Sequence, residues 1–215
     1  MPLHPPRFKG RKVARIAPGE YFVTAGDVVI STLLGSCVAA CLYDPEAGVA
    51  GMNHFMLSNR RYARDMHFSI TEAGRYGIHS MELLVNSLIR HGARRERLRA
   101  KAFGGASILT NSREVGNFSC VGSVNSDFIR EFLRTEGIPL VSADLGGDQG
   151  RVIYFDTRDR AVFVRKVRHR RSLIVARRDQ GLWHQDLQAH ERETPSVDLW
   201  LPEQGAPRQI TTKVP

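Results

Sequence analysis

Short runs of hydrophobic residues occupy the part of the chain that follows a proline-containing start. Three runs, at 28–34, 38–43 and 49–57, are rich in β-branched residues or interrupted by glycine. Short apolar runs of this kind favour β-strands over helices. The segment 43–48, YDPEAG, has the Pro and Gly of a turn. The second and third strands are therefore expected to fold back on each other.

Two helices are predicted farther along, where apolar positions recur every three to four residues. They are expected over 78–89 and 124–133, each followed by a glycine, with Asn125 or Ser126 capping the start of the second. Further short apolar segments predict strands at 98–103, 138–143, 152–155 and 161–167. In the last two, both faces are largely apolar, which is typical of strands covered on both sides.

This order of elements predicts an α+β (mixed α/β) fold. We expect a layered sandwich of mainly mixed and antiparallel β-sheet flanked by helices. The expected organisation is a flexible N-terminal extension over 1–18, one compact domain over 19–167, and a basic, mostly disordered tail over 168–215.

Composition narrows the class of protein. The 215 residues are 42% hydrophobic and 25% charged, as in a globular protein, and three cysteines are too few for a disulfide framework. Without a secretory signal or an apolar run of about 20 residues, the expected location is the cytoplasm.

The net charge of +9 is concentrated in three windows, at 1–15, 90–101 and 165–178. The last window has no aromatic residue, so the pattern does not favour nucleic-acid binding. It leaves open an acidic protein partner, an anionic membrane surface, or simple solvation of charged surface.

Cys37 is the candidate nucleophile, because it directly follows the small-residue turn Gly35–Ser36. Such a turn permits close approach to the sulfur, and its backbone N–H groups could stabilise an oxyanion. The competing interpretation is a small buried hydrophobic residue, which is the role expected for Cys41 and Cys120.

His54 is the candidate base, because among eight histidines it alone lies within an apolar, strand-like run. The turn at 43–48 should bring it near Cys37; the alternative is a core histidine bonded to a backbone carbonyl. No metal-binding, P-loop or dinucleotide motif is present, so no metal or cofactor is expected. These residues favour a cysteine hydrolase or transferase.

Five collinear motifs make the chain resemble the CheD family of chemoreceptor glutamine deamidases. They are LLGSCVA (33–39), GMNHFML (51–57), KAFGGA (101–106), EGI (136–138) and DLGG (144–147). With a closing hairpin at 152–167, the resemblance covers most of 19–167. It implies a cysteine-hydrolase-like domain that converts glutamines of methyl-accepting chemotaxis receptors to glutamate and releases ammonia.

The resemblance also implies roles for individual residues. Cys37 falls on the nucleophile and His54 on the base, with oxyanion donors at Gly35 and Ser36. A hydroxyl group orients the histidine, and it comes from Ser31 or Thr32; the offset from the cysteine favours Ser31. The implied partners are the cytoplasmic domains of the receptors and, as in some family members, a CheC-type phosphatase. A non-catalytic binding partner of that phosphatase is the alternative function.

Overall fold

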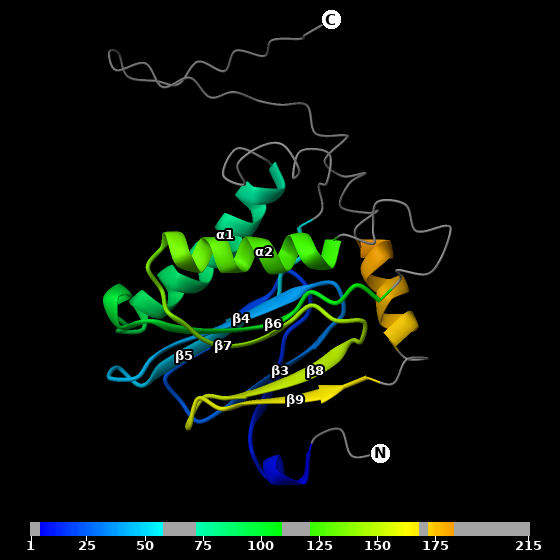
Figure 1. The fold of residues 1–215 in the computed structure, drawn as a ribbon. Helices are drawn as coiled ribbons and strands as arrows, with labels where there is room; N and C mark the ends of the chain where they lie inside the picture. The colour runs from blue at the N-terminus through cyan, green and yellow to red at the C-terminus, as the bar shows by residue number, and fades with distance from the viewer. Residues whose placement is uncertain (1–4, 58–71, 109–120, 168–171, 183–215) are drawn as a thin grey trace, which may run out of the picture.

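The computed structural model describes residues 5–57, 72–108, 121–167 and 172–182. Two β-sheets stack face to face, and two helices cover the outer face of one of them (Figure 1). The predicted α+β sandwich, with mixed sheets flanked by helices, is confirmed. None of the helices in the described segments combines the length and hydrophobicity needed to cross a bilayer.

The sheet next to the helices has five strands in the order β2-β5-β4-β6-β7. Their bounds are β2 Tyr21–Thr24, β4 Val38–Asp44, β5 Val49–Asn53, β6 Arg99–Gly104 and β7 Leu140–Leu145. All pairs are antiparallel except β6 with β7. Four of these strands match predicted ones, whereas β2 was not predicted. The turn at 43–48 joins β4 to β5, as expected, with Gly48 at φ +69°.

The second sheet has four strands in the order β1-β3-β8-β9. Their bounds are β1 Val13–Arg15, β3 Val29–Leu34, β8 Arg151–Asp156 and β9 Val162–Lys166. β8 is almost wholly buried, but three of the five residues of β9 are exposed. The prediction that both faces of the last strand are covered is therefore wrong for Val164, Arg165 and Lys166.

The two long helices, α1 Glu72–Arg90 and α2 Val121–Thr135, pack on the five-stranded sheet. A one-turn 3₁₀ helix, η3, spans Arg95–Arg97. Since α2 already begins at Val121, the prediction that Asn125 or Ser126 caps its start is wrong. Both residues lie inside the helix and are buried. Alternate residues of β4 divide between the core under the helices and the core between the sheets.

The described ends of the chain are structured, in contrast to the flexible extensions expected. Residues 5–18 include a 3₁₀ helix, η1 (Pro6–Phe8), and β1, and Phe8 packs on Tyr154 with ring centroids 5.6 Å apart. A further helix over 172–182, orange in Figure 1, lies within the tail. Cys120 and the parts of both extensions at 1–4, 168–171 and 183–215 lie outside the described residues.

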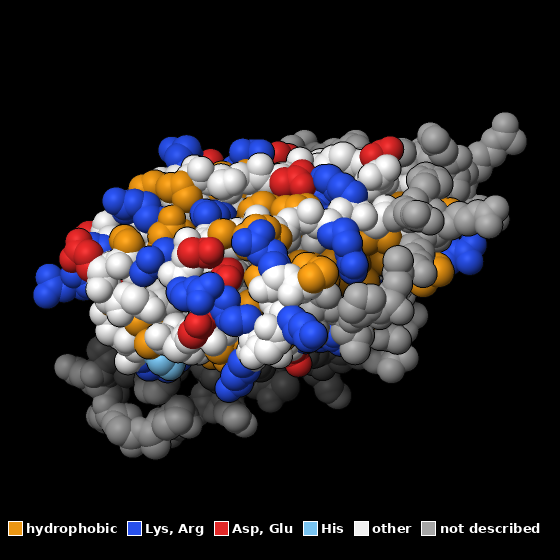
Figure 2. All heavy atoms as spheres, turned by 90° about the horizontal axis from the view of Figure 1, so that it is seen from below, with side chains coloured by type: hydrophobic (Ala, Val, Ile, Leu, Met, Phe, Trp, Pro, Cys, Tyr) orange, Lys and Arg blue, Asp and Glu red, His pale blue; other side chains and the backbone are white. Residues whose placement is uncertain are grey.

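Basic side chains are spread over the surface. On the face seen in Figure 2, Lys and Arg side chains lie among acidic and apolar ones and do not form one continuous patch. Several basic side chains of the described residues are paired with acidic ones: Arg11 with Asp156, for example, and Lys166 with Asp144. On this face the basic windows of the sequence therefore do not combine into a single basic surface.

Candidate active site

Cys37 and His54 face the same space, between the two sheets. Cys37 immediately precedes β4 and His54 immediately follows β5, and the adjoining residues Val38 and Phe55 exchange backbone hydrogen bonds of 3.0 and 2.9 Å. Side chains alternate along a strand, and both Val38 and Phe55 point to the helix side. Cys37 and His54 therefore share the opposite face as diagonal neighbours on adjacent strands, a relation that places residues about 7–8 Å apart.

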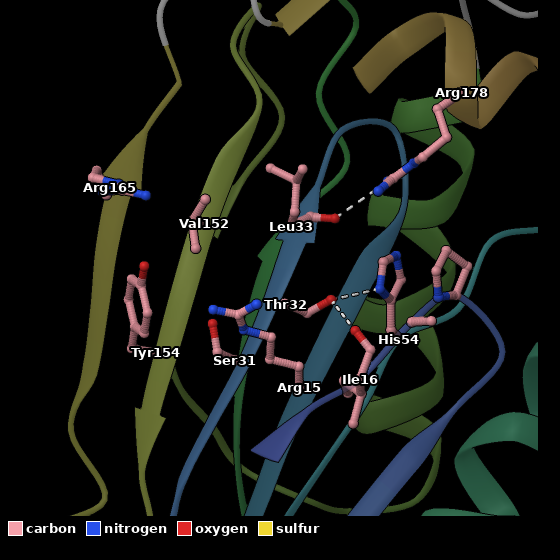
Figure 3. Close-up of a pocket in the computed structure, with 12 residues that line it drawn as sticks. Arg15, Ile16, Ser31, Thr32, Leu33, His54, Val152, Tyr154, Arg165 and Arg178 are labelled. Carbon is pink, nitrogen blue, oxygen red and sulfur yellow. Dashed lines mark hydrogen bonds between the residues drawn. The ribbon is translucent and has the colours of Figure 1, made fainter. Parts of the chain in front are cut away.

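Thr32 fixes the orientation of the His54 ring. Its Oγ1 donates a hydrogen bond to the carbonyl oxygen of Ile16 at 2.8 Å and also lies 2.8 Å from His54 Nδ1 (Figure 3). A hydroxyl has one proton, and Ile16 receives it, so the Thr32 oxygen accepts from a protonated Nδ1. The other ring nitrogen, Nε2, then has a free lone pair; it is buried and has no hydrogen-bond partner among the described residues.

Ser31 points away from His54. Along β3, Ile30, Thr32 and Leu34 face the space between the sheets, whereas Ser31 faces outward with Tyr154, as Figure 3 shows. The sequence left Ser31 and Thr32 open and favoured Ser31 by its offset. The structure brings only Thr32 of this pair to His54.

Ser36 supplies two hydrogen-bond donors at the turn before Cys37. Its backbone N–H and its Oγ both reach Oδ2 of Asp179, at 3.0 and 3.2 Å. Asp179 lies in the 172–182 helix and is fully buried. The two donors meet at one oxygen atom, which is the arrangement needed to hold a developing oxyanion.

Asn125 joins the cysteine turn to the histidine strand. Its side-chain amide donates to the carbonyl oxygen of Ser36 and its side-chain oxygen accepts from the N–H of Leu57, both at 2.8 Å. A second constraint comes from Gly105, whose N–H donates to the carbonyl oxygen of Cys37 at 2.8 Å. This role of Asn125 was not predicted from the sequence, where its position suggested a helix cap.

Burial controls the charge of the two central groups. Cys37 is fully buried and His54 is 1% exposed. Burial, together with the negative charge of Asp179, raises the pKa of the Cys37 thiol well above its usual value. Burial and the positive charge of Arg178 lower the pKa of His54 to about 3. At neutral pH the thiol and the imidazole are therefore both uncharged in this structure.

A cavity of about 350 Å³ adjoins the histidine side of the site. Its charged and polar lining consists of Arg15, Ser31, Thr32, His54, Tyr154, Arg165 and Arg178. Figure 3 shows Arg178 reaching from the 172–182 helix to the carbonyl oxygen of Leu33, 3.3 Å away. In the part of the chain that the structure describes, no three His, Cys, Asp or Glu side chains gather as a metal site requires.

Comparison with known proteins identifies clear relatives. The family model described as "CheD chemotactic sensory transduction" matches residues 56–166. The "Probable chemoreceptor glutamine deamidase CheD 1" of Geobacter sulfurreducens is 73% identical over 196 residues, which are 91% of this chain and 98% of that protein. A "Probable chemoreceptor glutamine deamidase CheD 2" from Shewanella oneidensis is 47% identical over 174 residues, 80% of this chain and 86% of the relative.

Similarity to solved structures is weaker. The crystal structure of the hypothetical protein YfiH from Bacillus licheniformis is 14% identical, with a TM-score of 0.38 over 58% of this chain and 50% of that one.

Proposed function

The chain belongs to the CheD family, and on that premise we propose that it is a chemoreceptor glutamine deamidase, an amidohydrolase that converts receptor glutamines to glutamate and ammonia. The hydrogen bond from His54 Nδ1 to Thr32 is the observation that best supports this chemistry. It leaves Nε2 free to accept a proton, on the face that His54 shares with Cys37.

In the first half of the proposed reaction, His54 Nε2 takes the thiol proton of Cys37 as the sulfur attacks the side-chain carboxamide carbon of the glutamine. The N–H of Ser36, with other backbone donors of the turn that begins at Gly35, holds the oxygen of the tetrahedral intermediate. Protonated His54 then gives its proton to the departing nitrogen, so ammonia leaves and a thioester to Cys37 remains.

In the second half, a water molecule loses a proton to His54 Nε2 and attacks the thioester carbon. The carbon–sulfur bond breaks, the proton returns to the Cys37 sulfur, and glutamate is released. Because both groups are neutral before the substrate binds, proton transfer must accompany each attack. The tautomer that Thr32 enforces is the one that both steps require, so Thr32 acts as a positioning residue.

The proposed substrates are the cytoplasmic domains of methyl-accepting chemotaxis receptors, and the proposed location of the protein is accordingly the cytoplasm. Each turnover replaces a neutral amide by a carboxylate, and added negative charge on a helical bundle weakens packing between like-charged helices. A CheC-type phosphatase partner stays a prediction, as does binding to that phosphatase without catalysis.

Replacing the nucleophile tests the proposal. We expect Cys37→Ala to abolish ammonia release from a purified receptor cytoplasmic domain, because Cys37 is the described cysteine that directly follows Ser36. Cys41→Ala is the matched control, since Cys41 is equally buried and lies on the same face of β4. Circular dichroism checks that both variants fold. Full activity of Cys37→Ala, or equal loss in both variants, contradicts the assignment.

A further inference from the structure

The helix over 172–182 is docked on the active site. Near its start, Ser172 Oγ accepts a hydrogen bond from the N–H of Gly150 at 3.2 Å. In its middle, Ala176 packs with Ala106 and Ile108. Towards its end, Asp179 is inserted fully into the protein and bonds to Ser36. The residues on its outer side, such as Ile174 at 68% exposure, face solvent.

Asp179 has a carboxylate oxygen at the position where the proposed reaction holds the amide oxygen of the substrate. Its Oδ2 receives the N–H of Ser36, the donor proposed to hold the amide oxygen of the substrate, and also the Oγ–H of the same residue. A carboxylate on a methylene group also has the chemical form of the end of the glutamate product. Asp179 is therefore placed as an intramolecular imitation of the bound product.

The turn beside Asp179 is shaped for this helix. A Cβ atom at Gly35 would lie 2.4 Å from Asp179 Oδ2 and 2.9 Å from a methyl carbon of Val175, and both distances are far below normal contact. The helix can approach the backbone this closely only because position 35 has no side chain.

The docked helix also suppresses the reactivity of the cysteine. Burial raises the pKa of the Cys37 thiol, and the charge of Asp179 on this helix raises it further, whereas Arg178 of the same helix has a smaller, opposite effect. Arg178, from the same helix, disfavours protonation of His54. With Cys37 fully buried, a glutamine side chain from another protein has no access to the sulfur.

From these contacts we propose that the 172–182 helix is an intramolecular inhibitor, which holds Asp179 in the substrate's oxygen-binding position and must leave before a receptor glutamine can bind. That the excluded substrate is a receptor glutamine rests on the proposed deamidase function. That the helix blocks Cys37 does not rest on it. Only the fraction of molecules with the helix undocked binds substrate, so the apparent affinity is reduced by that fraction.

The test measures access to Cys37 directly in the full-length chain. Iodoacetamide alkylation is followed by peptide mass spectrometry, with Cys37 as the reporter and buried Cys41 as an internal control for global unfolding. Loss of a hydrogen-bonded carboxylate weakens such docking enough for about a tenfold or greater effect. We therefore expect Asp179→Ala to raise the alkylation rate of Cys37 about tenfold or more, with Cys41 unchanged. Arg177→Ala, on the exposed side of the same helix, should alkylate like the wild type.

A second variant perturbs the other side of the contact. Gly35→Ala keeps Asp179 but introduces the Cβ that collides with it, so Cys37 should again alkylate faster than in the wild type. Unchanged Cys37 alkylation in both variants overturns the proposal. A rise at Cys37 that is matched at Cys41 in both variants also overturns it, because it reports opening of the whole domain.

Deamidation gives a separate readout. If the deamidase function holds, Asp179→Ala should raise kcat/KM for a receptor cytoplasmic domain by a factor similar to the change in alkylation. If neither the wild type nor Asp179→Ala releases ammonia from a receptor cytoplasmic domain, the proposed function fails, but the alkylation result continues to decide whether the helix covers the cysteine.

Discussion

The hydrogen bond between Thr32 and His54 allows a sharp test of the site. Thr32→Val replaces the hydroxyl by a methyl group of nearly the same size, so the packing between the sheets is preserved. The change removes the acceptor for Nδ1–H of His54 and the donor to the carbonyl oxygen of Ile16, both in a buried environment. Leaving buried polar groups unpaired costs about 1–3 kcal/mol in the free energy of unfolding.

The same substitution removes control of the tautomer. Without the acceptor at Nδ1, the ring can place its proton on Nε2, which then no longer accepts a proton from Cys37. In the wild type, a hydrogen bond worth about 1–3 kcal/mol favours the tautomer with the proton on Nδ1. Loss of this bond should therefore lower kcat/KM roughly 10- to 100-fold. Thr32→Ser keeps the hydroxyl and should restore activity to within about threefold of the wild type, an allowance of less than 1 kcal/mol.

Ammonia release from a receptor cytoplasmic domain measures the effect, and thermal unfolding measures the change in stability. Ser31→Ala is the matched control: it removes the neighbouring hydroxyl, which faces outward from the sheet, and activity should change less than about twofold, or 0.4 kcal/mol. Full activity of Thr32→Val would refute the tautomer argument. Loss of activity in Ser31→Ala equal to that in Thr32→Val would refute the assignment of the orienting hydroxyl.

Three further predictions concern stability and the geometry around Cys37. The pKa of His54 is lowered to about 3 in the folded protein, so between about pH 6.5 and pH 3 the unfolded chain binds the extra proton. The free energy of unfolding should therefore fall as pH decreases, by up to about 1.4 kcal/mol per pH unit. Urea denaturation at pH 7 and pH 5 should show this loss in the wild type, and a weaker one in His54→Gln. Gly104→Ala should destabilise by about 2 kcal/mol or more, since Gly104 has φ +113° and a Cβ there would lie 2.2 Å from the Cys37 carbonyl oxygen. Gly48→Ala, at φ +69° but in open space, should cost only about 1 kcal/mol in thermal unfolding. Asn125→Asp keeps an acceptor for the N–H of Leu57 but has no donor for Ser36, so deamidation should fall roughly tenfold; wild-type activity would contradict a positioning role.

Much of the fold follows from local patterns in the sequence. Apolar runs predicted most of the strands and both long helices, because burial of one face of an element leaves a period of two or 3.6 in the chain. The turn at 43–48 predicted the pairing of β4 with β5, and with it the placement of His54 on the strand beside Cys37. Two strands were not predicted: β1 and β2 are short and only partly buried, so they leave little pattern in the sequence.

Contacts between distant segments decided the details of the site. Because side chains alternate along a strand, only one of Ser31 and Thr32 can face His54, and which one does so depends on how the two sheets stack. Asn125 was judged by its position near a helix start, whereas its role depends on Ser36, 89 positions away in the chain.

The sequence by itself determined which residues have the chemistry of a cysteine hydrolase and roughly which elements hold them, because these properties are local. The tertiary structure alone decided that Asp179 lies against Ser36, a contact across 143 positions. A single acidic residue in a basic, polar stretch is typical of an exposed tail, and nothing in its sequence neighbourhood shows that it is buried. Asp179 is buried because the 172–182 helix packs against the turn that contains Ser36. The surface on which the helix packs forms only when distant segments of the chain fold together.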